Sequence, residues 1–206
     1  HCVNEPDTIS GNLRRLNNNK NGVLNLGMGM SEPLSEYASL KEYFPPIKKV
    51  KRVLWLYFKG DLKNLTKELN NKILSKYLYD KNFTQNLILR KHEIQKILLK
   101  KLDQEVLKQE KYSRSRSYIF IRFIKLGSIR KILFPDPAGP DPIPENEFIN
   151  ILKLSNEFTK KNNSKLYFIY LPSYRMYADK ENRESYKELI NVTEMVKSLN
   201  IPIIDI

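Results

Sequence analysis

The feature that most constrains the fold is a set of four short apolar runs separated by segments with helical periodicity. Each run is nearly continuous and rich in β-branched or aromatic residues, a pattern typical of strands buried on both faces of a parallel sheet. Strands that alternate with helices predict a doubly wound α/β fold with right-handed crossovers. The four runs are Gly22–Gly27, Arg52–Phe58, Lys165–Pro172 and Ile201–Ile206.

Helical spacing of apolar residues predicts the segments between the runs. Asp7 is the expected N-cap of the first helix, and Pro33 suits the first turn of the second. The predicted helices are Asp7–Leu16, Leu34–Phe44, Phe83–Leu107, Asn146–Lys161 and Arg183–Leu199.

The connection between the second and third runs is longer than a parallel crossover requires, since a single helix of a dozen or so residues would do. Part of the excess is the Pro-rich stretch Phe134–Glu147, which can be neither helix nor central strand. We therefore expect one domain over residues 1–206 with a basic, Pro-ended insertion at residues 82–147. Within it, Tyr118–Phe134 has the pattern of a basic amphipathic helix that packs on its own domain or lies on an anionic membrane.

The net charge of +13 is concentrated in one part of the chain, because residues 80–135 hold fourteen Lys or Arg against five Asp or Glu. Such an excess allows contact with an anionic surface through residues 82–134. A chain rich in Lys, Asn and Ile from an AT-rich genome would show the same bias without any partner. Nucleic acid is not an expected partner, because no nucleic-acid motif accompanies the charge.

The counts of reactive residues exclude several classes of site. Cys2 is the only cysteine, and His1 and His92 are the only histidines, so a thiolate cluster or a His-rich metal centre is excluded. We expect no metal and no cofactor, and we expect His92 to be a surface residue. No apolar run reaches the ~18 residues of a membrane span. The chain starts at His1 and stops in an apolar run, which predicts a fragment cut at both ends.

The loop Gly27-Met28-Gly29-Met30-Ser31 follows one predicted strand and precedes a helix, where ligands of open α/β sheets bind. A dinucleotide loop would need glycine where Glu32 stands, and a P-loop would need Gly-Lys-Ser/Thr. An oxyanion loop, which offers a backbone N–H to a developing negative charge, is the third reading. A tight turn without a ligand is the fourth.

The order and spacing of several short motifs resemble a branch of the SGNH/GDSL hydrolases. That branch has a Gly-rich loop after its second strand, a W-x-Y/F-Y/F-E-G-N-D-L strand end, F-S/T-Q-N-L and L-Y-F-x-Y-L-P. The matching positions here are Asn25, Gly27, Gly29, Ser31, Pro33, Leu34, Trp55, Tyr57, Gly60, Asp61, Leu62, Phe83–Leu87, Leu166–Pro172 and Ile201–Ile206.

The resemblance implies a three-layer α/β/α sandwich with a mostly parallel, flavodoxin-like sheet whose first strand is missing. It also implies a serine ester hydrolase that acts on acyl esters of lipid or envelope carbohydrate. The family's Gly-Asp-Ser block would precede His1 and its D-x-x-H block would follow Ile206, so these 206 residues are expected to be inactive. Asp205 is then more readily a structural residue of the last strand.

The resemblance also assigns the remaining site residues. Met30 falls on the oxyanion-loop glycine, beside Gly29, and Gly60–Asp61 stands where the family has Gly-Asn-Asp, so both oxyanion blocks are degenerate. Gly27, Ser31 and Glu32 are expected to line the substrate.

Two alternatives remain open. One is a non-catalytic relative that uses the cleft or the basic insertion for binding, and the other is an unrelated nucleotide-binding α/β protein. The residues themselves specify no compartment, although members of the family often act in the periplasm or elsewhere outside the cytoplasm.

Overall fold

A computed structural model places most of the chain. The structure describes residues 4–18, 20–29, 31–47, 49–113, 142–173 and 183–204. The predictions for His1, Cys2, Met30, Asp205 and the Tyr118–Phe134 helix lie outside these residues, as does most of the Pro-rich stretch.

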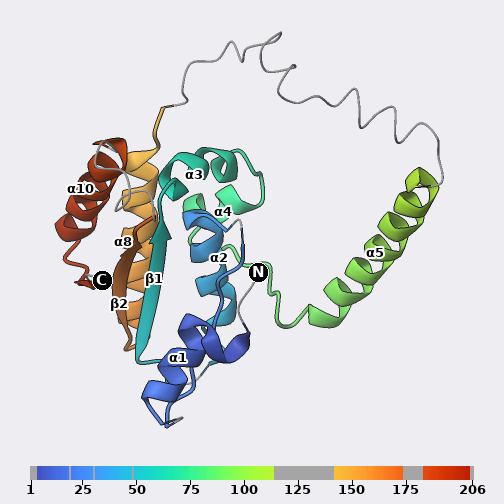
Figure 1. Cartoon of the computed structure of the whole chain (residues 1–206), viewed down its shortest axis with the longest axis horizontal. Coiled ribbons are helices and arrows are strands. Elements are labelled where there is room, and N and C mark those ends of the chain that lie inside the picture. Colours follow the sequence, from blue (N-terminus) through green and yellow to red (C-terminus); the bar gives the residue numbers. More distant parts are fainter. Residues whose placement is uncertain are drawn as a thin grey trace.

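The protein is an α/β protein with a parallel sheet, as the sequence predicts (Figure 1). The described strands are β1 (Arg52–Phe58), β2 (Lys165–Leu171) and β3 (Ile203–Ile204), in the order β1-β2-β3. Strands β1 and β2 are in register from Arg52 opposite Lys165 to Phe58 opposite Leu171. The carboxyl ends of β1 and β2 therefore meet at one edge of the sheet.

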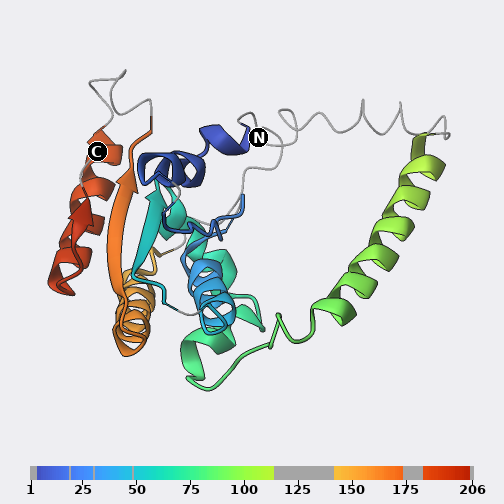
Figure 2. The ribbon, with the colours of Figure 1, turned by 90° about the horizontal axis from the view of Figure 1, so that it is seen from below.

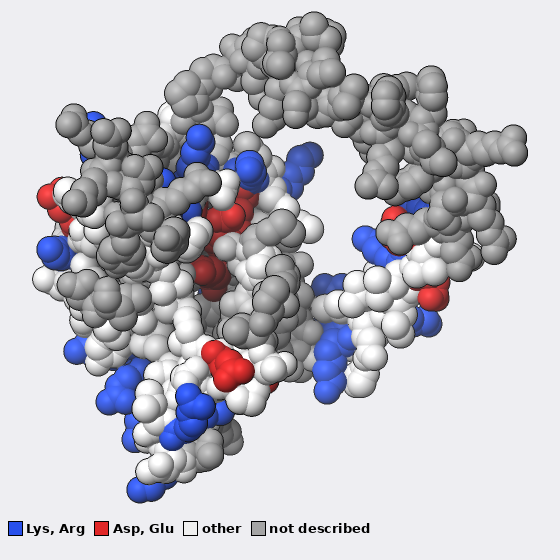
Figure 3. Space-filling model, in the orientation of Figure 1, with Lys and Arg blue, Asp and Glu red and all other residues white. Residues whose placement is uncertain are grey.

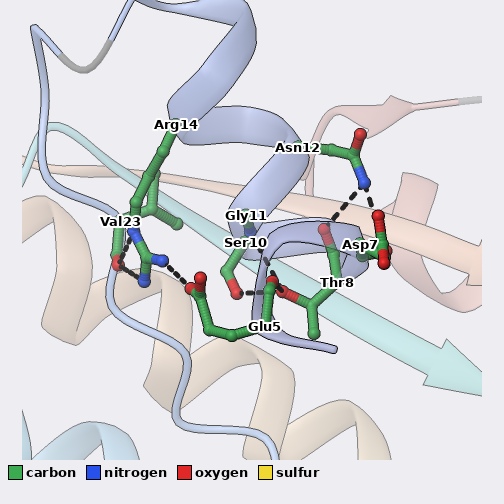
Figure 4. Close-up of polar contacts among 8 residues, drawn as sticks. All are labelled: Glu5, Asp7, Thr8, Ser10, Gly11, Asn12, Arg14 and Val23. Atoms are coloured by element: carbon green, nitrogen blue, oxygen red, sulfur yellow. Dashed lines mark hydrogen bonds and ion pairs between the residues drawn. The ribbon is translucent and has the colours of Figure 1, made fainter. Parts of the chain in front are cut away.

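The predicted strand at Gly22–Gly27 is wrong, because the segment has no strand structure and Leu24 is 59% exposed. A strand depends on pairing, and β1 pairs only with β2 in the described part of the chain. A side chain holds the segment instead: the Arg14 guanidinium donates to the Val23 carbonyl at 3.2 Å from Nε and 2.7 Å from Nη2 (Figure 4).

The first helix also starts later than predicted. Residues Glu5–Asp7 form a short 3-10 turn, η1, and helix α1 covers Ile9–Leu16. Thr8, not Asp7, is the N-cap, since its hydroxyl accepts the Gly11 N–H at 3.0 Å (Figure 4). A Cβ on Gly11 would lie 2.3 Å from the Glu5 carbonyl oxygen, so the close approach of η1 requires glycine there.

The other described helices are α2 (Pro33–Tyr43), α3 (Asp61–Leu69), α4 (Leu74–Tyr79), α5 (Lys91–Ser113), α8 (Glu145–Lys161) and α10 (Arg183–Ser198). Helices α3 and α4 were not predicted from the sequence. Helices α1 and α8 lie on opposite sides of the sheet, and α5 stands away from the rest of the molecule (Figures 1 and 2). Among the helices that the structure describes, none is long and apolar enough to cross a membrane.

The core lies on one face of the sheet, between the strands and α2, α3, α4, α8 and α10. Its largest fully buried side chains include Tyr57, Phe148 and Phe168. On the opposite face Leu54 and Leu56 are only half-buried, and Phe58 at the end of β1 is 50% exposed. The expectation of strands buried on both faces is therefore wrong for β1, because its second face is only half-buried.

The prediction that a helix starts at Phe83 is wrong. The buried carboxylate of Glu42 binds the segment Phe83–Leu87 in another conformation. Glu42 accepts the Thr84 hydroxyl at 2.7 Å, the Gln85 N–H at 2.6 Å and the Leu87 N–H at 2.9 Å. It also accepts the Tyr77 hydroxyl at 2.5 Å. We call this set of contacts the Glu42 anchor; the long helix begins only beyond it, at Lys91.

Candidate functional site

The Gly-rich loop is open to solvent at its described positions. Gly27 and Gly29 are exposed, and the Ser31 N–H donates to the Met28 carbonyl at 3.2 Å to close a turn. A Cβ on Gly29 would meet nothing within 4 Å, and neither glycine has a positive φ. Packing and backbone conformation therefore do not explain why glycine stands at position 29.

The first turn of α2, which follows this loop, contacts the buried carboxylate of Glu68. Glu68 of α3 accepts the Leu34 N–H at 2.8 Å and the Ser35 N–H at 3.2 Å, and it also accepts the Ser35 hydroxyl. The Glu32 N–H lies 3.3 Å from Glu68 Oε1. Glu68 thus satisfies the first N–H groups of α2, which is the usual role of an acidic group at a helix N-terminus.

The second predicted block, Gly60–Asp61, forms the turn from β1 into α3. Gly60 has a φ of 98°, a left-handed conformation that favours glycine. Its N–H donates to Glu188 of α10 at 2.8 Å, and Asp61 Oδ2 accepts the Phe58 N–H at 2.7 Å. The Gly60 N–H therefore already has a carboxylate partner in Glu188.

The structure brings the two predicted blocks together. The side chain of Glu32, directly after the Gly-rich loop, lies close enough to those of Asp61 and Asn64 for both to act on its pKa. Of the predicted site residues, Glu32, Gly60 and Asp61 thus meet at the carboxyl end of β1, whereas Gly27 and Gly29 lie in the exposed loop beside them.

Five acidic residues gather around this point, and we call them the acidic cluster: Glu32, Glu36, Asp61, Glu68 and Glu188. Burial, with the charges of Asp61, Glu68 and Glu32 next in size, raises the pKa of Glu36 well above its ordinary value. Burial also raises the pKa of Asp61 to about 7; the charges of Glu32 and Glu188 act in the same direction and the Phe58 N–H acts against them. Acidic atoms are visible near α2 and α3 in the middle of one face (Figure 3).

Two tyrosines at the ends of β1 and β2 complete the site. Tyr57 donates its hydroxyl to Glu188 at 2.8 Å and accepts the Leu62 N–H at 3.2 Å. Tyr170 is opposite Tyr57 in the sheet, and their ring centroids are 5.3 Å apart with a 33° tilt. The hydroxyl of Tyr170 is buried and has no hydrogen-bond partner among the residues that the structure describes.

Sequence reasoning missed most of this arrangement. Glu188 lies in α10, far along the chain from Gly60, and nothing in its local sequence indicates the contact. Two aromatic residues that close neighbouring strands, Tyr57 and Tyr170, were the signal that could have been used, because parallel strand ends meet at one edge. His92 is exposed on α5, as predicted.

The chemistry of the site is that of acceptors and exchangeable protons. An oxyanion requires fixed donors, whereas the acidic cluster presents carboxyl oxygens. The described residues include no group of three or more His, Cys, Asp or Glu side chains that could hold a metal ion.

Comparisons with known proteins leave the family open: no protein-family model, no curated protein and no solved structure matches this chain.

Proposed function

We propose that the chain is part of an SGNH-type acyl-ester hydrolase domain, a three-layer α/β/α sandwich that acts on esters of lipid or envelope carbohydrate. The motif order along the sequence supports this proposal. The observation that carries it is the contact of Glu32 with Asp61, which joins the end of the Gly-rich loop to the Gly60–Asp61 turn at the carboxyl end of β1. These are the two blocks that would build the oxyanion site in such an enzyme.

We further propose that the 206 residues alone do not hydrolyse esters. The Gly60 N–H is bound to Glu188, and Asp61 stands where a neutral side-chain donor would be needed. Loss of one oxyanion donor typically lowers the rate by about 10²–10³. Turnover of p-nitrophenyl acetate should therefore equal that of a denatured control, and saturable turnover above it would contradict this part of the proposal.

The DNA on both sides of this coding segment provides the direct test of the family. We expect a Gly-Asp-Ser block before His1 and a D-x-x-H block after Ile206. The complete protein should then hydrolyse esters, and replacement of that serine by alanine should abolish the activity. A reading frame whose flanks encode neither block would reject the hydrolase proposal.

A binding protein without catalysis is the second candidate, and the bond from Gly60 to Glu188 favours it specifically. A carboxylate bound at the turn where the oxyanion would need a donor is more consistent with a fold that has kept its site for binding. Retained ligand binding in a complete protein that turns over no ester would support this candidate over the first.

A further inference from the structure

The unpartnered hydroxyl of Tyr170 is the first sign of a ligand. Tyr170 is only 5% exposed, and its ring lies beside that of Tyr57 at the matching position of the next strand. Because the Tyr57 hydroxyl reaches Glu188 and the Leu62 N–H, the neighbouring Tyr170 ring extends to the same side, where the charges of Glu188 and Asp61 act on it. A buried hydroxyl without a partner is costly, since it has lost its hydrogen bonds to water.

Among the described residues, two carboxyl oxygens of the acidic cluster are buried without a partner in the same way as the Tyr170 hydroxyl. Oε2 of Glu32 and Oε2 of Glu36 are buried and lack a hydrogen-bond partner within the described ranges of the chain. In the part of the chain that the structure describes, the ion pairs join Arg14 to Glu5, Arg90 to Glu93 and Lys108 to Glu105, all outside the cluster. Lys67 lowers the pKa of Glu32, but it is the smallest of the five influences on that group.

A ligand that complements these acceptors, as the described residues present them, supplies hydrogen-bond donors and positive charge. The absence of a three-residue ligand group among the described residues argues against a bare metal ion. An ammonium group carries three donors and holds its acceptors at about 2.7–3.2 Å from the nitrogen, a looser shell than the roughly 2.0–2.6 Å of a metal ion. We propose that the acidic cluster, together with Tyr170, binds an organic cation with N–H donors, such as a primary ammonium group.

Asp61 is the centre of this site, because it contacts Glu32 and acts electrostatically on both Glu36 and Tyr170. Its charge attracts the ammonium group, while Glu36 and Tyr170 offer the unpartnered acceptors. The net charge of the whole chain is +13, so the overall charge of the protein repels a cationic ligand. Binding of a cation to this protein would consequently report a local site, and it does not require ester hydrolysis.

The test is a titration of the full chain with methylammonium chloride at pH 8 and constant ionic strength, followed by NMR or calorimetry. Tetramethylammonium serves as a cation of similar type without N–H donors. We expect saturable methylammonium binding, with a Kd on the order of millimolar, and no saturable binding of tetramethylammonium. At pH 6 the affinity should be about tenfold weaker, because the pKa of Asp61 near 7 leaves little of its carboxylate there.

Single substitutions localise the binding. Asp61→Asn should weaken it about tenfold or more, and Tyr170→Phe about threefold, because each removes one proposed contact. Glu93→Gln, which removes the same charge from an exposed position on α5, is the matched control and should leave the affinity unchanged.

Four results would overturn the proposal: no methylammonium binding at pH 8, equal binding of tetramethylammonium, an equal loss in the Glu93→Gln variant, or saturable Mg²⁺ binding that methylammonium does not displace. None of these results depends on esterase activity, so the proposed hydrolase function can fail or hold independently.

Discussion

Two buried acidic regions of this protein differ in how their carboxylates are satisfied. The Glu42 anchor surrounds one carboxylate with four donors from Tyr77, Thr84, Gln85 and Leu87. The acidic cluster places several carboxyl groups close to one another, and oxygens of Glu32 and Glu36 have no hydrogen-bond partner in the described part of the chain.

The pKa values of the two regions move in opposite directions for this reason. Burial alone would raise the pKa of Glu42, but the four hydrogen bonds outweigh it and hold the pKa below its ordinary value. In the acidic cluster burial dominates and the neighbouring charges add to it, so the pKa values of Glu32, Glu36 and Asp61 are raised. A fully satisfied carboxylate indicates a structural role, whereas an unsatisfied group at the edge of the sheet indicates a site.

The largest effect is expected at the Glu42 anchor. Glu42→Gln should lower the free energy of unfolding by about 2–3 kcal/mol at pH 7, because an amide cannot accept all the donors that surround it. Since the folded-state pKa of Glu42 is depressed, its contribution is present above the unfolded pKa near 4.5 and is lost as the pH falls further. Urea denaturation measures the change.

The matched control for this prediction is Glu157→Gln, at an exposed position on α8, which should change stability by less than about 0.5 kcal/mol. An equal loss in both variants would mean that net charge, rather than the Glu42 hydrogen bonds, governs stability.

In the acidic cluster, removal of a carboxylate should increase the free energy of unfolding instead of lowering it. Asp61→Asn should raise the free energy of unfolding at pH 8 by about 1 kcal/mol, a value kept small because water partly screens this side chain. The folded-state pKa of Asp61 is raised from 3.8 to about 7, so the wild-type protein loses stability as the pH rises between these values. Denaturation at pH 8 and pH 5 should show the gain shrinking at the lower pH; a destabilised variant at pH 8 would contradict it.

The smallest effect is expected at Tyr170. Tyr170→Phe should change stability by less than about 0.5 kcal/mol, because its hydroxyl has no hydrogen bond to any described residue that the substitution would remove. Tyr57→Phe is the comparison, since it removes the bonds to Glu188 and Leu62 and should cost about 1–2 kcal/mol. Thermal unfolding of the two variants measures this difference. An equal loss of stability in both would contradict the prediction.

Local pattern was a good guide where packing agreed with it. The run Arg52–Phe58 is β1 at the predicted boundaries, and the helix predicted from Asn146 begins one residue earlier, as α8. It failed where a distant side chain decides the backbone. Phe83–Leu87 has helical spacing, but Glu42 binds its N–H groups in another conformation.

The candidate site divides in the same way. Its residues Glu32, Gly60 and Asp61 were predicted from the sequence, because they belong to the ordered motifs that resemble the SGNH/GDSL hydrolases. Glu68, Glu188 and the pairing of Tyr57 with Tyr170 were not visible, since each contact joins segments far apart in the chain.

The sequence by itself determined the α/β class, the two longer strands and most helices, because periodicity is a property of neighbouring residues. Only the tertiary structure decided that Gly22–Gly27 would form no strand and that the expected oxyanion site would contain an acidic cluster. Strand pairing and carboxyl pKa values depend on which segments meet in space, and no local pattern records that.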